Sequence, residues 1–309
     1  MRYFRNEIEL VKWTFNYVIV NKPSGIVCQG TESNTLLAGL LEKFKHLNPN
    51  PSQFRISQRL DRFTTGGLIV ARNGKWANKI RKSFADEPSD LSLMRRYVGL
   101  LAIPKNKSIQ DLGLEYYVGT NPEESYKGLK FNDETLSAGT IDFDIDALEK
   151  DYRGPKRQRQ LLKYDAVTKF QILEHLGRIP STKMTSKYPD LFMNRKIIPL
   201  VFELKTGRKN QIRDHVLQAF KIPLLNDDNF ATFKTHSVDN YTDINSSVFK
   251  SNQIGLHSGL LRMKNKDNEE QSFVFPICAE SDRELWDGFI DQNGTLIPEI
   301  SKELLNWKC

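Results

Sequence analysis

The strongest constraint on the fold is a short segment near residue 60, where one acidic residue stands between two arginines and shortly precedes an apolar run. Residues 68–71 are apolar, partly β-branched and preceded by two glycines, a pattern that predicts a buried strand reached through a turn. The loop that feeds this strand holds Arg59, Asp61 and Arg62. Loops on a rigid sheet often carry catalytic groups, and a carboxylate beside guanidiniums is expected to stay ionised. Asp61 is therefore a candidate nucleophile; the alternative is that it caps a turn beside surface arginines.

The charge balance favours a polyanionic partner. Of the 309 residues, 27% are charged and 39% are apolar, and the formal net charge is +7. An excess of Lys and Arg attracts nucleic acid through counterion release, so nucleic acid is favoured over acidic metabolites. The alternative is a basic protein that is merely soluble, and composition does not distinguish the two.

The cysteines and the hydropathy of the sequence indicate in which kind of cellular compartment the protein is expected. Cys28, Cys278 and Cys309 are odd in number and lack a C-x-x-C spacing, so the sequence supports neither a disulfide framework nor a zinc cluster. No apolar run approaches the roughly 20 residues that a membrane helix needs, and the start lacks the apolar segment of a secretory signal. We expect a soluble intracellular protein. The first six residues are mildly basic, but two glutamates follow, which leaves targeting open.

Residue periodicity predicts strands interleaved with helices. Amphipathic helical spacing occurs in residues 35–44 and 75–84, and a third helix is expected after residue 210. Strands are predicted within residues 17–27, 95–102, 164–173 and 198–205.

Two polar stretches interrupt this pattern. Residues 105–138 lack a sustained period and are interpreted as an inserted surface loop or small subdomain, and residues 177–196 as a second insertion, basic and loop-like. The densest basic run, residues 153–160, is a candidate for contact with an RNA backbone. The sequence contains no internal repeat, and we expect a single domain spanning residues 1–309.

The segment around Asp61 resembles the central motif of RluA-type RNA pseudouridine synthases, H-R-L-D-x-x-T-S-G-L-L-L-V-A. Gln58 stands where that pattern has His, and Gly67 departs from its spacing. The resemblance implies that Asp61 is the catalytic residue. It also implies an α+β fold, with a mixed, mainly antiparallel twisted sheet, flanking helices and a central cleft.

A second segment, residues 206–215, resembles the family motif T-G-R-x-H-Q-I-R-x-H, with Asn210 replacing one His. The resemblance implies that Arg213 pairs with Asp61, which suits a desolvated acid that needs a counter-charge. The alternative is a helix charge that faces solvent. We interpret His215 as a core histidine with satisfied hydrogen bonds.

Further segments match the family in order. Residues 95–101 resemble K-x-Y-x-A-L-V, with Arg95 replacing Lys, which implies that Tyr97 is the active-site tyrosine rather than one more strand aromatic. Residues 223–230 resemble P-I-x-G-D-x-x-Y-G, weakened by Asn226 and Phe230. Residues 17–27 resemble V-V-N-K-P-x-G-x-x-V, and residues 256–261 resemble L-H-A-x-x-L.

The implied reaction isomerises a uridine in RNA, which requires no redox cofactor and no metal. Arg59, Arg62, Arg95 and Arg208 are expected to contact the RNA, and Arg62 is the candidate to fill the gap left by an extruded base. Two other classes remain open. A non-catalytic RNA-binding protein would explain the charge, and a carboxylate glycosidase would need a second acid, for which only the cluster at Asp142, Asp144 and Asp146 is near.

The compact size and the Asn- and Lys-rich insertions resemble the small fungal members that modify mitochondrial large-subunit rRNA. We therefore expect a mitochondrial, monomeric enzyme with rRNA as its partner. The alternative is a cytoplasmic enzyme of the same family that acts on tRNA.

Overall fold

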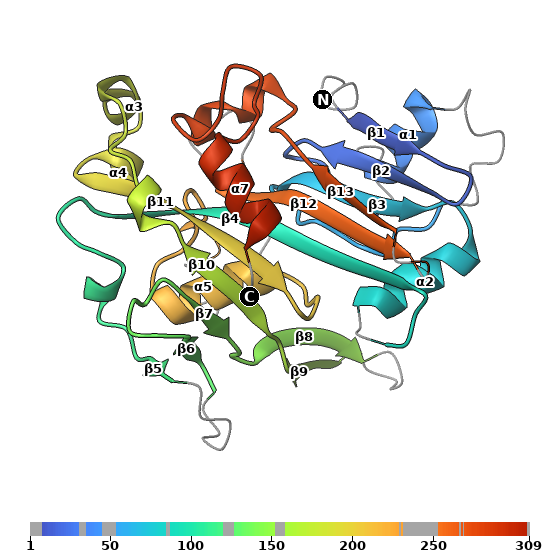
Figure 1. The fold of residues 1–309 in the computed structure, drawn as a ribbon, viewed down its shortest axis with the longest axis horizontal. Helices are drawn as coiled ribbons and strands as arrows, with labels where there is room; N and C mark the ends of the chain where they lie inside the picture. The colour runs from blue at the N-terminus through green and yellow to red at the C-terminus, as the bar shows by residue number, and fades with distance from the viewer. Residues whose placement is uncertain are drawn as a thin grey trace.

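One large sheet organises the chain in the computed structural model (Figure 1). The structure describes residues 8–30, 35–44, 54–84, 87–119, 127–151, 158–228, 230, 253–265, 267 and 269–307. The sheet has eleven strands in the order β1-β2-β3-β12-β4-β11-β10-β7-β6-β5, with β13 paired to β12. The pairs β3–β12 and β5–β6 are parallel and the others are antiparallel. The expected α+β class with a mixed, mainly antiparallel sheet is confirmed.

The strands are β1 (Glu9–Trp13), β2 (Tyr17–Lys22), β3 (Thr65–Ala71), β4 (Leu91–Pro104), β5 (Tyr117–Val118), β6 (Leu129–Phe131), β7 (Ala138–Ile141), β8 (Ile145–Asp151), β9 (Gln158–Tyr164), β10 (Thr168–Ile172), β11 (Arg195–Leu204), β12 (Leu256–Asn265) and β13 (Glu270–Val274). The helices are α1 (Leu36–Lys43), α2 (Gly74–Phe84), α3 (Thr182–Lys187), α4 (Pro189–Phe192), α5 (Gln211–Phe220) and α7 (Pro298–Asn306).

The long strand β4 lies at the centre of the sheet and serves two cores. Side chains alternate between the faces of a strand. Tyr97 and Leu101 join the apolar cluster that includes α5, whereas Val98 and Leu100 join the cluster that includes α7. Figure 1 shows α7 lying across β4 and β12, the two strands that it contacts. The sheet is therefore covered on both faces at its centre.

Arg96 anchors the C-terminal helix to the back of β4. Its guanidinium is buried and donates to the carbonyl oxygens of Leu304 at 2.7 Å and Trp307 at 2.6 Å, and to the Glu203 carboxylate at 2.9 Å. Cationic donors at a helix C-terminus satisfy free carbonyls and oppose the helix dipole. This anchor lies directly behind the part of β4 that carries Arg95 and Tyr97.

The sequence predicted a loop-like insertion at residues 177–196, and this prediction is wrong. They contain α3, capped by the Ser181 hydroxyl, and α4, and together these helices bury Met184, Leu191 and Phe192. Their lengths of six and four residues are too short to display a helical period, which is the reason that the sequence pattern missed them.

The stretch 105–138 was expected to be a surface loop or a small subdomain, and part of it joins the main sheet. Its strand β6 pairs with β7 in the main sheet and buries Leu129 and Phe131, although residues 120–126 lie outside the described part. Strands β8 and β9 form a separate two-stranded sheet, and most of the basic run 153–160 lies outside the described residues. The continuity of the main sheet from β1 to β13 supports the proposal of one domain.

Two glycines at the start of β3 are required by close packing. Gly66 has a φ of +108°, and a Cβ there would overlap the backbone of Ser258 on β12. A Cβ on Gly67 would overlap the ring of Phe275. Only glycine adopts this backbone conformation and this approach without strain. The pair therefore fixes the position at which the chain enters β3 from the Asp61 loop.

We predict that Gly66→Ala lowers the free energy of unfolding by about 3 kcal/mol, because it combines a strained φ with overpacking. Gly74→Ala is the matched control. Gly74 begins α2 with no atom near its missing Cβ, so the change should be neutral or slightly stabilising. Urea unfolding measures both variants, and equal stabilities would contradict the packing argument.

Candidate active site

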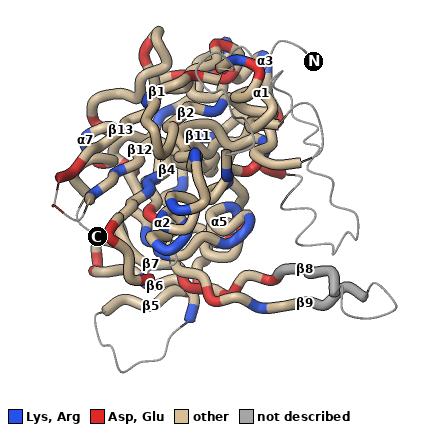
Figure 2. Tube along the Cα trace, turned by 90° about the vertical axis from the view of Figure 1, so that its right-hand side faces the viewer, with Lys and Arg blue, Asp and Glu red and all other residues tan. Residues whose placement is uncertain are grey.

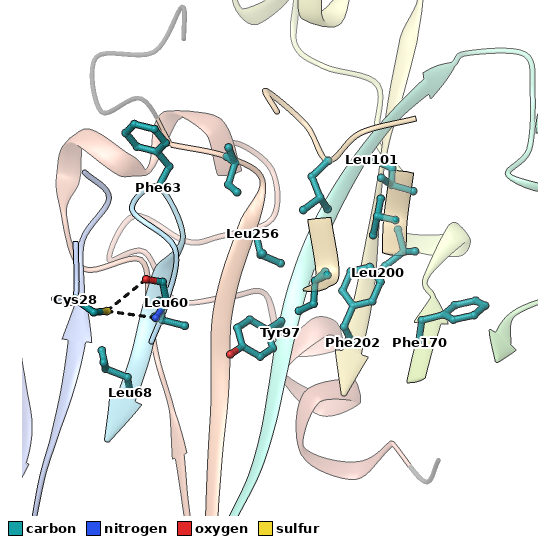
Figure 3. Close-up of a cluster of buried hydrophobic side chains, with 14 of the residues drawn as sticks. Cys28, Leu60, Phe63, Leu68, Tyr97, Leu101, Phe170, Leu200, Phe202 and Leu256 are labelled. Carbon is teal, nitrogen blue, oxygen red and sulfur yellow. Dashed lines mark hydrogen bonds between the residues drawn. The ribbon is translucent and has the colours of Figure 1, made fainter. Parts of the chain in front are cut away.

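The Asp61 carboxylate lies on the loop before β3, with 24% of its side chain exposed to a cleft. Its neighbour Leu60 is buried and held at both backbone groups by Cys28. The Leu60 amide donates to Cys28 Sγ at 3.3 Å, and the thiol donates to the Leu60 carbonyl at 3.4 Å (Figure 3). The backbone beside Asp61 is therefore fixed by the segment that follows β2.

Lys22 also fixes the Asp61 loop, through hydrogen bonds to backbone carbonyl oxygens. Its ammonium is fully buried and donates to the carbonyl oxygens of Pro23 at 2.9 Å, Ile26 at 3.0 Å and Arg62 at 3.1 Å. Burial lowers the pKa of Lys22, and negative groups nearby, Asp61 among them, oppose this shift. The three carbonyls join the turn after β2 to the residue that follows Asp61.

Arg213 is the centre of the polar network. It is only 2% exposed, and its Nε and Nη2 donate to the two carboxylate oxygens of Asp227, both at 2.8 Å. Its Nη1 donates to Asn210 Oδ1 at 3.2 Å and lies 3.8 Å from Asp61 Oδ2. The ring of Phe230 covers the guanidinium at 4.3 Å. The structure thus places Arg213 beside Asp61, although the carboxylate closest to Arg213 is that of Asp227. The alternative that Arg213 is a helix charge facing solvent is wrong.

At two positions where this sequence departs from the family motifs, the residue present is an asparagine in a left-handed backbone conformation. Asn210 and Asn226 have φ values of +56° and +64°, in the left-handed region that glycine and asparagine tolerate best. Asn210 precedes α5 and accepts from Arg213, while Asn226 precedes Asp227 and donates to the Gln253 carbonyl at 2.7 Å. Both substitutions therefore preserve the backbone turns that aim Arg213 and Asp227 at each other.

The other motif residues of α5 build its support. Gln211 accepts from Thr206 Oγ1 at 2.8 Å and donates to Thr168 Oγ1 at 3.0 Å. His215 donates from Nε2 to the Phe143 carbonyl at 3.0 Å, so its Nδ1 accepts from Thr168 at 2.9 Å. Burial lowers the pKa of His215 to about 4, which keeps it neutral. The interpretation of His215 as a satisfied core histidine is confirmed.

Tyr97 and Arg95 lie two residues apart on the cleft side of β4. Tyr97 is 4% exposed, and its register places it opposite Ser258 on β12. Burial raises the pKa of Tyr97, and the neighbouring Arg95 and Gln58 oppose that rise. The Arg95 guanidinium is also buried and stacks on the ring of Phe84 at 3.9 Å.

Arginines form the rim of the cleft, which has a volume of about 910 Å³. Arg59 is exposed there, Arg62 donates to the Gly25 carbonyl at 3.2 Å, and Arg208 donates to the Asp165 carbonyl at 3.1 Å. Figure 2 shows Lys and Arg gathered around α2 and α5 on this side of the molecule. The structure therefore brings all seven predicted site residues to one cleft or its wall.

Sequence reasoning missed two members of this site. Asp227 lies within the segment 223–230 that resembles a family motif, and an acid in a turn shortly after the Arg213 helix is a signal that could have identified it. The sequence around Lys22 indicated only a strand that ends in a turn. Its role could not be predicted, because its three carbonyl partners are brought together by the tertiary fold.

Among the described residues, no group of three or more His, Cys, Asp or Glu side chains is arranged to hold a metal ion. Within the same part of the chain, every helix is too short or too polar to span a bilayer.

We predict that Asp227→Ala lowers the free energy of unfolding by about 3–5 kcal/mol, because it leaves the buried Arg213 charge without its bidentate partner. Asp228→Ala is the matched control, since Asp228 is exposed and should change stability by at most about 0.5 kcal/mol. Chemical denaturation measures both. An Asp227→Ala protein as stable as its control would contradict the assigned network.

Comparison with known proteins agrees with this geometry. The family model of RNA pseudouridylate synthase matches residues 16–218. A 21S rRNA pseudouridine(2819) synthase of Candida albicans is 48% identical over 284 residues, which is 91% of this chain and 100% of that protein. The protein of the same name from Saccharomyces cerevisiae is 23% identical over 98% of each chain.

A solved structure has the same fold. Human RNA Pseudouridylate Synthase Domain Containing 1 aligns with a TM-score of 0.51 and 18% identity, over 96% of this chain and 94% of that chain. Because the family model matches about two thirds of the chain, the two alternatives, a glycosidase and a non-catalytic RNA-binding protein, are not supported. The chain belongs to the RNA pseudouridylate synthase family and is an isomerase that converts uridine in RNA to pseudouridine.

Proposed function

We propose that Asp61 is the nucleophile of this isomerase and that Arg213 holds its carboxylate in place. In the reaction the bond between uracil N1 and ribose C1′ breaks, the base turns, and a bond forms between C5 and C1′. C5 loses a proton and N1 gains one, so the composition of the RNA is unchanged and no oxidant is required. One ionised carboxylate that attacks the sugar or the base is sufficient to hold the two fragments together.

The observation that carries this proposal is that Arg213 contacts two carboxylates, one buried and one open to the cleft. Asp227 occupies two of its nitrogen atoms, and the third, Nη1, lies 3.8 Å from the Asp61 carboxylate at the cleft. Asp227 is 2% exposed and saturated by Arg213, whereas Asp61 is partly open to the cleft. Of these two acids, Asp61 is the one that a substrate can reach.

The remaining residues suit RNA binding. Tyr97 offers an aromatic surface to the loose base beside Asp61. Arg62, the next residue in the chain, is the candidate to brace the stack after the target nucleotide leaves it. Arg59 and Arg208 are assigned to phosphate contacts because they are exposed on the rim, and Arg95 to the inner wall.

We predict that Asp61→Asn abolishes isomerisation while the dissociation constant for RNA changes less than about threefold, because affinity rests on many phosphate contacts and chemistry on one carboxylate. Tritium release from RNA labelled at uridine C5 measures the reaction, and fluorescence anisotropy measures binding. The control is Asp190→Asn, an exposed site on α4. Turnover by Asp61→Asn would remove Asp61 from the nucleophile role.

We also propose that the substrate is mitochondrial large-subunit rRNA and that the enzyme works in mitochondria. Two curated relatives that align along most of this chain carry names that specify 21S rRNA, which supports an rRNA substrate. The expected basic start lies outside the described residues. A monomer remains the expectation, since Asp61, Tyr97, Arg213 and Asp227 all come from one chain.

We expect cells that lack this protein to lose one pseudouridine from mitochondrial large-subunit rRNA, with tRNA modification unchanged. The wild-type gene should restore the site, and Asp61→Asn should not. Pseudouridine mapping measures this, and cell fractionation should find the protein in mitochondria. A cytosolic protein whose loss removes a tRNA pseudouridine would refute the substrate and the location together.

A further inference from the structure

Two hydrogen-bond donors in the wall of the active-site cleft form no well-aligned hydrogen bond among the described residues, although both side chains interact with the Tyr97 hydroxyl. They are Nε2 of Gln58 and Nε of Arg95, and both atoms are buried. The two side chains are 4% and 6% exposed and both line the cleft beside Tyr97. A buried donor without an acceptor costs about 1–3 kcal/mol, so such a pair is expected to gain acceptors in the working state.

The direction of the Gln58 amide is set by the protein. Its Oε1 accepts from the backbone amide of Ile69 at 3.4 Å, and a backbone N–H can only donate. The NH₂ group must therefore take the other side of the amide, near the Tyr97 hydroxyl, where it forms no well-aligned hydrogen bond. Arg95 is a donor at every nitrogen. On these two side chains, the atoms without a well-aligned hydrogen bond are therefore both donors.

A uracil ring is the complement of such a wall. It has two carbonyl oxygens, at C2 and C4, and no exocyclic donor. Cytosine carries an amino group at C4, which would face a donor with a donor. A turn of the free base about its N3–C6 axis exchanges N1 with C5 and also exchanges the two carbonyl groups. Donors that hold carbonyl oxygens before the turn therefore find equivalent acceptors after it.

Resting on the isomerase function proposed above, we propose that Gln58 and Arg95 bind the carbonyl oxygens of the target uracil. In this role they distinguish uridine from cytidine and hold the detached base through its rotation. Both positions differ from the family motifs, which have His and Lys there. Each of those residues also carries a donor, so the replacement preserves the chemistry while changing the geometry.

The test is a chemical double-mutant cycle with the full-length enzyme. Synthetic RNA of the mapped site carries uridine, 2-thiouridine or 4-thiouridine at the target, because sulfur is a poor hydrogen-bond acceptor. For wild type, we expect each sulfur to lower kcat/KM about 5- to 10-fold, the value of one hydrogen bond. Gln58→Met should lower kcat/KM for uridine about 10-fold and reduce the sulfur penalty to about 2-fold or less.

Further variants separate recognition from folding. Gln58→Glu keeps the acceptor for Ile69 and loses the donor, so it should behave as Gln58→Met does even if that variant is unstable. Gln58→His restores a ring donor and should recover most of the activity and the sulfur penalty. Gln292→Met, an exposed site, should match wild type in rate and in sulfur penalty. RNA affinity should stay within about 2-fold in all of them.

Full activity of both Gln58→Met and Gln58→Glu would overturn the inference. So would reduced activity with an unchanged sulfur penalty, since it would mean that Gln58 only supports Tyr97. These results leave the isomerase function intact, because wild type is active in every arm. A wild-type enzyme that forms no pseudouridine in any RNA would instead overturn the function and this inference with it.

Discussion

The buried guanidinium of Arg213 is the interaction on which the site depends. A charge with 2% exposure has lost most of its hydration, and only a geometrically good partner compensates for that loss. Asp227 supplies this partner through two parallel hydrogen bonds of 2.8 Å, the arrangement in which Arg and carboxylate interact most strongly. With that pair in place, the remaining nitrogen can face Asp61 at a distance of 3.8 Å without having to neutralise it fully. Asp61 is thereby oriented and still open to a substrate.

Orientation of Arg213 would achieve little if the Asp61 loop moved. Three contacts hold it at successive positions: Cys28 on Leu60, Lys22 on the Arg62 carbonyl, and His257 on Thr65 at 2.8 Å. None of these groups reaches the cleft with a charge of its own. They form a second layer that fixes the geometry of the first, which is the condition for an acid to sit in an attacking position.

The sequence predicts the parts of this fold whose signals are local. The strand after Gly67 and the helix from Gln211 follow from apolar periodicity and turn residues, and Asp61 and Arg213 follow from the family resemblance. The role of Asp227 was not predicted, because its partner Arg213 lies on a different element. Asp227 reaches Arg213 only because Asn226, the residue before it, adopts a left-handed backbone conformation. Helices α3 and α4 escaped because a period of 3.6 residues cannot be seen in six or four positions. The role proposed for Gln58 depends on the surroundings of its Nε2 atom, which only the tertiary structure defines.

The triplet Arg95-Arg96-Tyr97 shows why two arginines can occupy the middle of a central strand, a place where charge is normally excluded. Alternation sends Arg96 to the rear face, where Glu203 and the last carbonyls of α7 bind it completely. The same alternation sends Arg95 and Tyr97 to the cleft, where the Arg95 guanidinium stacks on the ring of Phe84 and its Nε lacks a well-aligned hydrogen bond. The rear arginine therefore stabilises the protein, whereas the front arginine is the one that we propose to bind the target base. Because they share one stretch of backbone, docking of α7 behind β4 also fixes the position of Tyr97 in front of it.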